Sequence, residues 1–151
     1  MIPFVFGLFV IVGFMDNIGF VDFLADLLLK IATDDWTAML VVGFVAAILC
    51  QCVNNQPMTV LLSTVLSRIK EKEDDPPDWL QGAYFALAIG ANLGGNGTPI
   101  ASLAVLMWKG ILEKWDIYIK YVAFTRKGLP VTLLLVGVCV VLTAIEVVYM
   151  F

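Results

Sequence analysis

The sequence lacks histidine and has only three cysteines, Cys50, Cys52 and Cys139. Without histidine, the chain cannot form an imidazole proton relay or a histidine-rich metal site. All three cysteines lie inside apolar runs, so they do not suggest a disulfide framework. No nucleophile–base pair or metal cluster can be assembled from what remains. We therefore expect no catalytic residue, no resident metal and no cofactor, and we do not expect an enzyme.

Charge is also scarce. Only 15% of the residues are charged against 61% hydrophobic ones, and the mean hydropathy is +0.95. A soluble domain has about 25% charged residues. The uncharged runs cover residues 1–15, 36–67, 79–108 and 128–145. Because a spanning helix needs about 20 mostly apolar residues, the sequence predicts an all-α, multi-pass integral membrane protein. It would lie in the cell membrane if the source is prokaryotic, with lipid as a partner and no nucleic acid.

Two of the runs have a length that fits neither one membrane span nor two. Residues 36–67 and 79–108 would each measure about 45 Å as one straight helix, well beyond a hydrocarbon core of about 30 Å. Each is nevertheless too short for two full spans and a turn. A polar stretch interrupts each run near its middle, VNNQP at residues 53–57 and GGNGTP at residues 94–99. This pattern predicts a re-entrant hairpin over residues 36–69 and a broken helix over residues 79–109.

The two interruptions share one design, a polar residue followed by proline and then renewed apolar sequence. Proline is favoured at the first position of a helix, so we expect helices to restart at Pro57 and Pro99, with Thr98 as an N-cap. The preceding arms would then leave free carbonyl groups near residues 50–53 and 89–93. Paired discontinuous helices of this kind indicate a transporter binding site. The alternative is that each break is only a packing kink.

The remaining segments fit around these two runs. We predict a span over residues 1–17, an interfacial helix over residues 18–31 and a last span over residues 128–149. The interfacial helix is amphipathic, because Asp22, Asp26 and Lys30 fall on one stripe. Residues 109–127 carry five basic and two acidic residues, whereas residues 68–78 carry three basic and five acidic ones. The positive-inside rule therefore places the loop over residues 109–127 in the cytoplasm.

The interrupted stretches resemble a known family. NNQPMTVLL (residues 54–62) and GANLGGNGTPIASLAVLMW (residues 90–108) are similar to the ArsB-type arsenical-pump membrane proteins, within the ion transporter superfamily. TRKGLP (residues 125–130) resembles the turn before that family's last helix. The GGNG stretch is closer to the wider superfamily, which includes sodium/proton antiporters and carriers of dicarboxylates, citrate and silicic acid. This departure bears on the substrate and not on the superfamily.

The resemblance covers this whole chain but only about the C-terminal third of a family member. It implies one repeat of an inverted-repeat secondary transporter, whose hairpin tip and broken helix meet at the membrane midplane. The other repeat would be missing, so the chain is either a fragment, which we favour, or a half-size protein that assembles with a second half. The resemblance also implies a homodimer as one option, and a soluble pump ATPase as a partner if the protein is an arsenical pump.

The predicted site consists of neutral hydrogen-bonding groups and backbone. Its candidate substrate- or ion-binding residues are Asn54, Asn55, Thr59, Asn92, Gly94, Gly95, Asn96, Thr98 and Ser102. Such groups suit Na⁺ or a neutral polyhydroxy solute such as arsenous or silicic acid. Cys50 and Cys52 are two residues apart, so on a helix they face different sides and do not chelate together.

We expect efflux of arsenite or antimonite, small inorganic substrates, by alternating access. The alternatives are a sodium/proton antiporter, a silicic acid or citrate-like carboxylate carrier, a channel-like subunit, or a membrane fragment that does not transport. Neither broken run contains Asp or Glu. Proton coupling, if present, would therefore use Asp16, Glu146 or the missing half.

Overall fold

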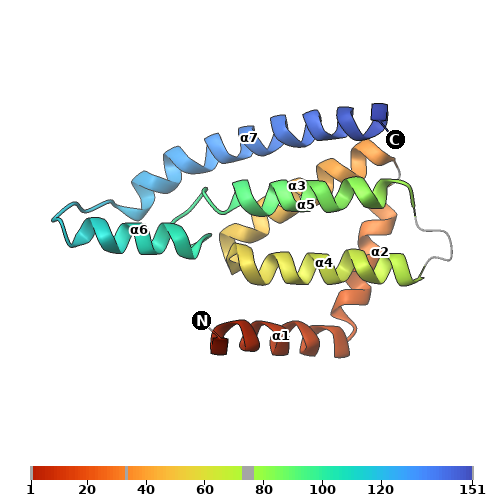
Figure 1. Cartoon of the computed structure of the whole chain (residues 1–151), viewed down its shortest axis with the longest axis horizontal. Coiled ribbons are helices and arrows are strands. Elements are labelled where there is room, and N and C mark those ends of the chain that lie inside the picture. The colour runs from red at the N-terminus through yellow and green to blue at the C-terminus, as the bar shows by residue number, and fades with distance from the viewer. Residues whose placement is uncertain (1, 33, 73–76, 151) are drawn as a thin grey trace.

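The computed structural model describes residues 2–32, 34–72 and 77–150, and these residues form helices and no strand. The helices are α1 (Ile2–Asn17), α2 (Phe20–Ile31), α3 (Asp35–Val53), α4 (Asn55–Lys72), α5 (Trp79–Gly94), α6 (Leu103–Glu113) and α7 (Tyr121–Met150) (Figure 1). The all-α expectation is confirmed for these residues. Met1 of the predicted first span and residues 73–76 of the predicted acidic loop lie outside the described residues.

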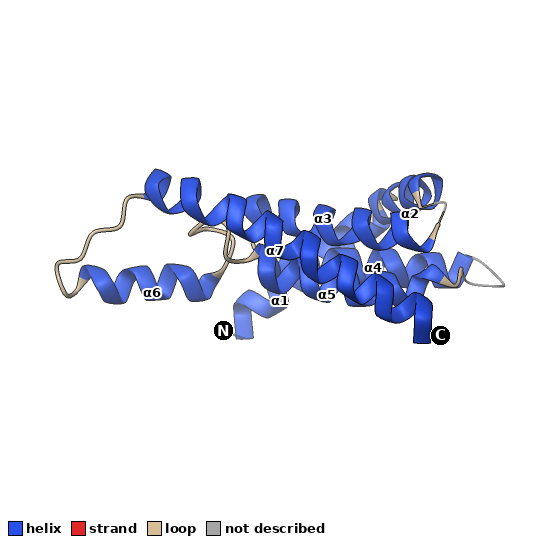
Figure 2. Ribbon diagram, turned by 90° about the horizontal axis from the view of Figure 1, so that it is seen from above, coloured by secondary structure: helices blue, strands red, loops and turns tan. Residues whose placement is uncertain are grey.

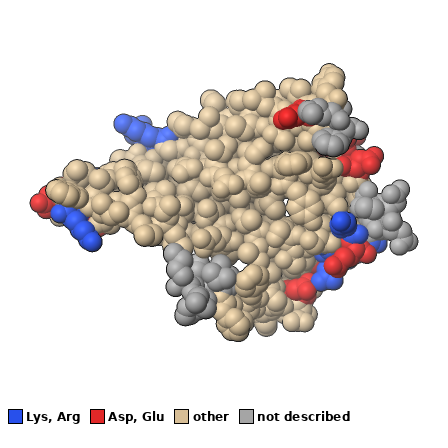
Figure 3. All heavy atoms as spheres, viewed as in Figure 1, with Lys and Arg blue, Asp and Glu red and all other residues tan. Residues whose placement is uncertain are grey.

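The charged side chains gather towards the two ends of the long axis, and uncharged atoms cover the middle of the face shown in Figure 3. Among the described helices, α3 and residues 121–147 of α7 are long and apolar enough to cross a membrane, with mean hydropathies of 2.1 and 2.5. The uncharged middle is the arrangement that a bilayer requires of its protein.

Close packing of α3 against α5 forms the centre of the molecule. Small residues recur every fourth position along α5, at Gly82, Ala86, Gly90 and Gly94, and all four are buried. A Cβ at Gly94 would lie 2.7 Å from the Cα of Ala47 on α3. Small residues let two helix backbones approach closely, which is how helices associate where no water drives them together. This contact brings the C-terminal ends of α3 and α5 side by side.

Both predicted interruptions are breaks between helices. The first is a single residue, Asn54, between α3 and α4. The second is longer, because α5 ends at Gly94 and α6 begins at Leu103. In Figure 1, α3 and α4 meet at the Asn54 end and run back towards the same end of the molecule. They form a helical hairpin, and its re-entrant position in a membrane remains a prediction.

The predicted restart points are wrong in both runs. The helix α4 begins at Asn55, so Pro57 is its third residue, where the missing N–H still needs no intrahelical partner. The helix α6 restarts at Leu103 and not at Pro99, and its N-cap is Ser102 and not Thr98. The Thr98 hydroxyl instead accepts a hydrogen bond from the Ala101 N–H at 3.3 Å, which closes a turn before the helix.

The helix α2 is a separate amphipathic element, as expected, but part of its charged stripe faces protein. Gly19, with φ 78°, separates it from α1. Asp22 and Asp26 contact Lys72 at 3.0 and 3.1 Å. Arg68 pairs with Asp16 at the end of α1. Ion pairs therefore tie both α1 and α2 to the C-terminal end of α4.

The last helix begins earlier than predicted. The TRKGLP stretch is not a turn, because α7 runs from Tyr121 to Met150 and passes through Pro130 without ending. Gly128 has a different reason to be glycine. A Cβ there would lie 2.9 Å from the Gly97 carbonyl oxygen and 3.2 Å from that of Asn96. This glycine lets α7 approach the α5–α6 break closely.

The helix α6 stands apart from the packed helices. None of its described residues is buried, and Figures 1 and 2 show it extending beyond the rest of the molecule, on one side of α7. Trp108 is its link to α7, because its ring centroid lies 6.5 Å from that of Phe124. The apolar surface of α6 is therefore left largely uncovered.

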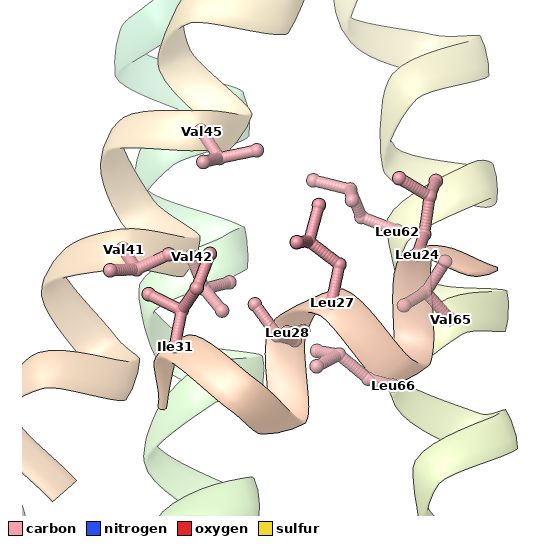
Figure 4. A pocket seen from close by; sticks show the side chains of 10 residues that line it. All are labelled: Leu24, Leu27, Leu28, Ile31, Val41, Val42, Val45, Leu62, Val65 and Leu66. Carbon is pink, nitrogen blue, oxygen red and sulfur yellow. The ribbon is translucent and has the colours of Figure 1, made fainter. Parts of the chain in front are cut away.

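An apolar pocket of about 90 Å³ lies between α2 and the α3–α4 hairpin (Figure 4). Its lining residues are Leu24, Leu27, Leu28, Ile31, Val41, Val42, Val45, Leu62, Val65 and Leu66. All of these side chains are hydrocarbon, so the pocket has no polar group with which to orient an ion or a hydrophilic solute. The candidate site must therefore lie elsewhere.

Candidate functional site at the two helix breaks

The two breaks lie against each other. The Asn55 N–H donates to the Ala101 carbonyl at 3.0 Å, and Asn54 Nδ2 donates to the Ile100 carbonyl at 3.1 Å. Both bonds join the tip of the α3–α4 hairpin to the segment between α5 and α6. Residues more than forty positions apart in the sequence are thus brought into one polar junction.

The hairpin tip turns through an unusual backbone conformation. Asn54 has φ 76° and ψ 152°, a combination that favours glycine. Its N–H donates to the Cys50 carbonyl at 3.2 Å, and its Oδ1 accepts from the Gln56 N–H at 3.3 Å. The bonds of the Asn54 side chain to nearby backbone groups offset the strain of this conformation. Asn54 therefore ends α3, caps α4 and bonds to the backbone of the α5–α6 break.

The α5–α6 break is formed by short turns and close backbone contacts. The N–H groups of Asn96 and Gly97 donate to the carbonyls of Leu93 and Gly94, at 3.0 and 3.1 Å. A Cβ at Gly95 would lie 3.3 Å from Asn55 Nδ2 and 3.4 Å from the Ser102 Cβ. Gly95 thus lets the Asn55 side chain reach the backbone of the break.

The arms leave fewer free carbonyls than expected. The Ala91 carbonyl accepts from the Gly95 N–H at 3.3 Å and from Cys50 Sγ at 3.7 Å. The Cys50 carbonyl pairs with Asn54 and the Leu93 carbonyl with Asn96. The short turns at each break recapture these groups, because buried backbone acceptors that stay unpaired are costly.

The structure brings together six of the nine predicted site residues. Asn54, Asn55, Gly94, Gly95, Thr98 and Ser102 belong to the junction or to its immediate backbone. Thr98 is buried, with 5% of its surface exposed. The role of these residues in binding stays a prediction.

The other three residues bond within their own helices or at their ends. Thr59 Oγ1 donates to the Asn55 carbonyl at 2.7 Å, and Asn92 Nδ2 donates to the Ala88 carbonyl at 2.7 Å. Asn96 Nδ2 donates to the Asn92 carbonyl at 3.2 Å, and Asn96 also lines an open cavity of about 610 Å³ beside α7, together with Lys127 and Thr132. The Asn92 and Asn96 side chains therefore bond away from the hairpin tip, whereas Thr59 contacts the tip from within α4.

Gln51 is the residue that the sequence analysis missed. Its Nε2 donates to the Ala47 carbonyl at 2.8 Å and to the Gly94 carbonyl at 2.7 Å, so one side chain joins α3 to the end of α5. A single glutamine three residues before the tip, in the otherwise apolar C-terminal half of α3, was the available signal. Thr125 on α7 was also missed, and its Oγ1 is buried without a partner among the described residues.

The junction itself is uncharged, and the ion pairs of Arg68 and Lys72 lie at the other end of the hairpin. The hydrogen bond from Lys72 holds the pKa of Asp22 below its usual range, and the same contact raises the pKa of Lys72. Cys50 is buried whereas Cys52 is exposed, so the two thiols face different sides as predicted. No group of three or more His, Cys, Asp or Glu residues in the described ranges is placed to hold a metal ion.

The chain matches one family model and several known proteins. A family model described as citrate transporter (CitMHS) matches residues 1–150. The chain is similar to an arsenical pump membrane protein of Escherichia coli, with 33% identity over 135 residues, which cover 84% of this chain and 29% of that protein. It is also similar to the P protein of Mus musculus, with 31% identity over 148 residues, which cover 91% of this chain and 17% of that protein.

An arsenical pump membrane protein of Yersinia enterocolitica is 31% identical over 140 residues, which cover 87% of this chain and 30% of that protein. The chain thus spans less than a third of the length of the curated relatives it matches, at 29%, 17% and 30%. No solved structure matches the chain.

Proposed function

The chain belongs to the citrate transporter family, and on that premise we propose that it forms half of the binding site of a secondary carrier. Its relatives are membrane transport proteins, so this is a membrane protein of a family that moves ions or solutes. In the proposal the helices cross the membrane several times. The α3–α4 hairpin is re-entrant, and α5 and α6 are the halves of one discontinuous helix.

The observation that carries the proposal is the direct contact between the two breaks. Asn54 and Asn55 bond to the carbonyls of Ile100 and Ala101, although both segments interrupt long apolar runs. Irregular backbone at membrane depth is tolerated where it is buried in protein or lines a wet cavity. A junction of two such breaks offers amides and carbonyls that can replace the hydration shell of a solute.

We propose arsenite and antimonite as the substrates, moved outward by alternating access. Residues 50–60 and 92–102 contain no Asp, Glu, Lys or Arg. A tricarboxylate needs a counter-charge at its site, whereas arsenous acid is a neutral solute whose hydroxyl groups pair with amides and carbonyls. The arsenical pump relatives, at 33% and 31% identity, support the same substrate class.

A carboxylate carrier is the second candidate, and the family description favours it. Here Na⁺ would bind first to the amide and carbonyl oxygens and supply the missing positive charge. A sodium/proton antiporter and a silicic acid carrier use the same groups. A membrane fragment without transport is the remaining alternative.

We also propose that the chain needs a second repeat to complete the site. The uncovered apolar surface of α6 supports this, since none of its described residues is buried. The second repeat would come from the rest of a longer protein or from a separate half. A homodimer of such carriers and, for an arsenical pump, a soluble ATPase are further proposed partners.

The test is uptake into everted membrane vesicles by the full-length carrier that contains this chain. Arsenite, antimonite, Na⁺, silicic acid and citrate are compared in turn. We expect Asn55→Ala and Thr98→Ala to lower arsenite uptake roughly tenfold or more, because each removes a polar group from the junction. Membrane expression should stay near normal.

Asn17→Ala and Thr64→Ala are the matched controls. Asn17 and Thr64 bond to carbonyls of their own helices, away from the junction. Unimpaired flux in both junction variants would rule out the proposed site. Uptake of citrate and not of arsenite would support the carboxylate carrier in place of the arsenite carrier.

A further inference from the structure

Gln51 lies where α3, α5 and the α5–α6 break come together. It precedes the hairpin tip by three residues, and its Nε2 donates to the carbonyls of Ala47 and Gly94. These two bonds use both amide protons of the side chain. The carboxamide is therefore held by a carbonyl on its own helix and a carbonyl on the neighbouring one.

The contacts also fix which way the amide points. Both partners are carbonyl oxygens, which only accept hydrogen bonds, so the NH₂ group must face them and Oε1 must face away. Oε1 is buried and has no hydrogen-bond partner among the described residues. A buried acceptor without a partner is rare and calls for an explanation.

The α5–α6 break leaves room for this amide. A Cβ at Gly97 would lie 2.8 Å from Gln51 Oε1 and 2.9 Å from Nε2. Gly97 therefore lets the backbone of the break lie against the carboxamide without displacing it. The unpaired oxygen thus sits at the segment where α5 and α6 come apart.

We infer that Gln51 is a ligand of the carrier's site, with Oε1 reserved for a bound hydroxyl donor or cation. The inference rests on the proposed function of the two breaks. Its Nε2 bonds hold the amide in place before the ligand arrives, so the oxygen needs no reorganisation on binding. Because Oε1 is sealed from solvent, the ligand that reaches it is desolvated and enclosed.

A competing role is that Gln51 only ties α3 to α5. Two substitutions separate the roles, because Gln51→Met removes both the donors and the acceptor, whereas an ionised Gln51→Glu removes the donors and keeps acceptor oxygens. A ligand role predicts that the methionine variant loses more affinity than the glutamate variant, because both lose the two Nε2 bonds and only the glutamate keeps acceptor oxygens. A tie alone predicts equal losses in both variants.

The experiment uses the full-length carrier in proteoliposomes at pH 8. It measures the KM for arsenite, from initial uptake rates, and the half-saturating concentration of Na⁺. We expect Gln51→Met to raise one of these two constants roughly tenfold or more. If the ligand is a cation, Gln51→Glu lowers the half-saturating Na⁺ concentration below wild type. If it is a hydroxyl group, Gln51→Glu raises the KM for arsenite less than Gln51→Met does. Gln81→Met and Gln81→Glu, at an exposed position of α5, are the matched controls.

Equal losses in Gln51→Met and Gln51→Glu would overturn the inference, as would wild-type constants in Gln51→Met. If Gln51→Met does not reach the membrane, Gln51→Lys takes its place, since it keeps donors for both carbonyls and has no acceptor. Wild-type constants in that variant also overturn the inference. If Asn55→Ala does not reduce transport, the result counts against the proposed function. If Asn55→Ala abolishes transport but Gln51→Met leaves it unchanged, the result overturns only the role of Gln51.

Discussion

Asn54 illustrates what a single residue does at the junction. Its φ of 76° and ψ of 152° lie in a region that glycine prefers, yet its side chain bonds to Gln56 and to Ile100. The polar identity of this tip could be predicted, because an Asn-Asn pair inside an apolar run has few other uses. The role of Gln51 could not, because the sequence does not show which residue of α3 faces the end of α5.

We predict that Asn54→Gly and Asn54→Ala separate strain from contact. A strained conformation of this kind costs an asparagine or alanine about 1–3 kcal/mol, and glycine relieves it. Asn54→Gly should therefore unfold close to the wild-type temperature but lose transport, since the bond to Ile100 is gone. Asn54→Ala should unfold at a lower temperature than wild type and should also lose transport. The measurements are thermal unfolding in detergent and arsenite flux, and normal flux in Asn54→Gly would show that the side chain is not needed.

At the scale of elements, two kinds of contact hold the helices, small-residue packing between α3 and α5 and ion pairs between α2 and α4. The interrupted runs could be predicted from length and composition. The restart of α6 could not, since Thr98 and Ser102 are equally good N-caps in sequence and only the turn at Thr98 decides between them. The prediction of a turn at TRKGLP was wrong for the same reason. The close approach of Gly128 to Gly97, which explains the glycine, is visible only in three dimensions.

We predict that Gly90→Ala destabilises the protein by roughly 1–3 kcal/mol, a typical result of overpacking. A Cβ at Gly90 would collide with the backbone oxygen of Gly43, which cannot rotate away. Gly110→Ala is the matched control on α6, where a Cβ meets nothing within 4 Å. Gly110→Ala should stabilise the protein by about 0.5–1 kcal/mol. Unfolding temperatures in detergent compare the two, and equal shifts would contradict the close α3–α5 packing.

The ion pairs predict a pH dependence of the α2–α4 contact. The pKa of Asp22 is lowered, so its contribution is complete above its usual value of about 3.9 and is lost as pH falls through the lower folded value. The pKa of Lys72 is raised, so its contribution is complete below about 10.4 and is lost as pH rises through the higher folded value. The contact should therefore be strongest between these limits.

Lys72→Met should remove the alkaline part of this dependence and weaken the acidic part, because Arg68 still lies 3.8 Å from Asp22. The measurement is the unfolding temperature from pH 3 to 11. Lys109→Met is its control, because Lys109 pairs with Glu113 only within α6. An unchanged profile in Lys72→Met would show that the ion pairs do not stabilise the contact.

At the scale of the whole molecule, charges lie towards the ends, a junction of two breaks lies within the uncharged part, and α6 extends beyond the packed helices (Figures 1 and 3). The segregation of charge could be predicted from the runs alone. The meeting of the two breaks was implied by family resemblance, since no property of either stretch alone specifies its partner. What covers α6 lies outside this chain in our proposal.

We predict that the amides of α6 exchange hydrogen faster in this chain alone than in the full-length carrier. A second repeat that packs on α6 would bury its backbone and slow its opening. The amides of α3, which is already packed against α5 and α7, are the internal control and should exchange alike in both. Equal exchange of α6 in both proteins would show that the second repeat does not cover it.

Counterflow of radiolabelled arsenite in proteoliposomes tests the central claim, that the meeting of the two breaks forms a carrier's binding site. Vesicles preloaded with unlabelled arsenite should show trans-stimulated entry of label through the wild-type full-length carrier. The Asn55→Ala protein, reconstituted in equal amount, should show none. Equal counterflow through both proteins, or label entry through the wild type that preloading does not stimulate, would contradict the account.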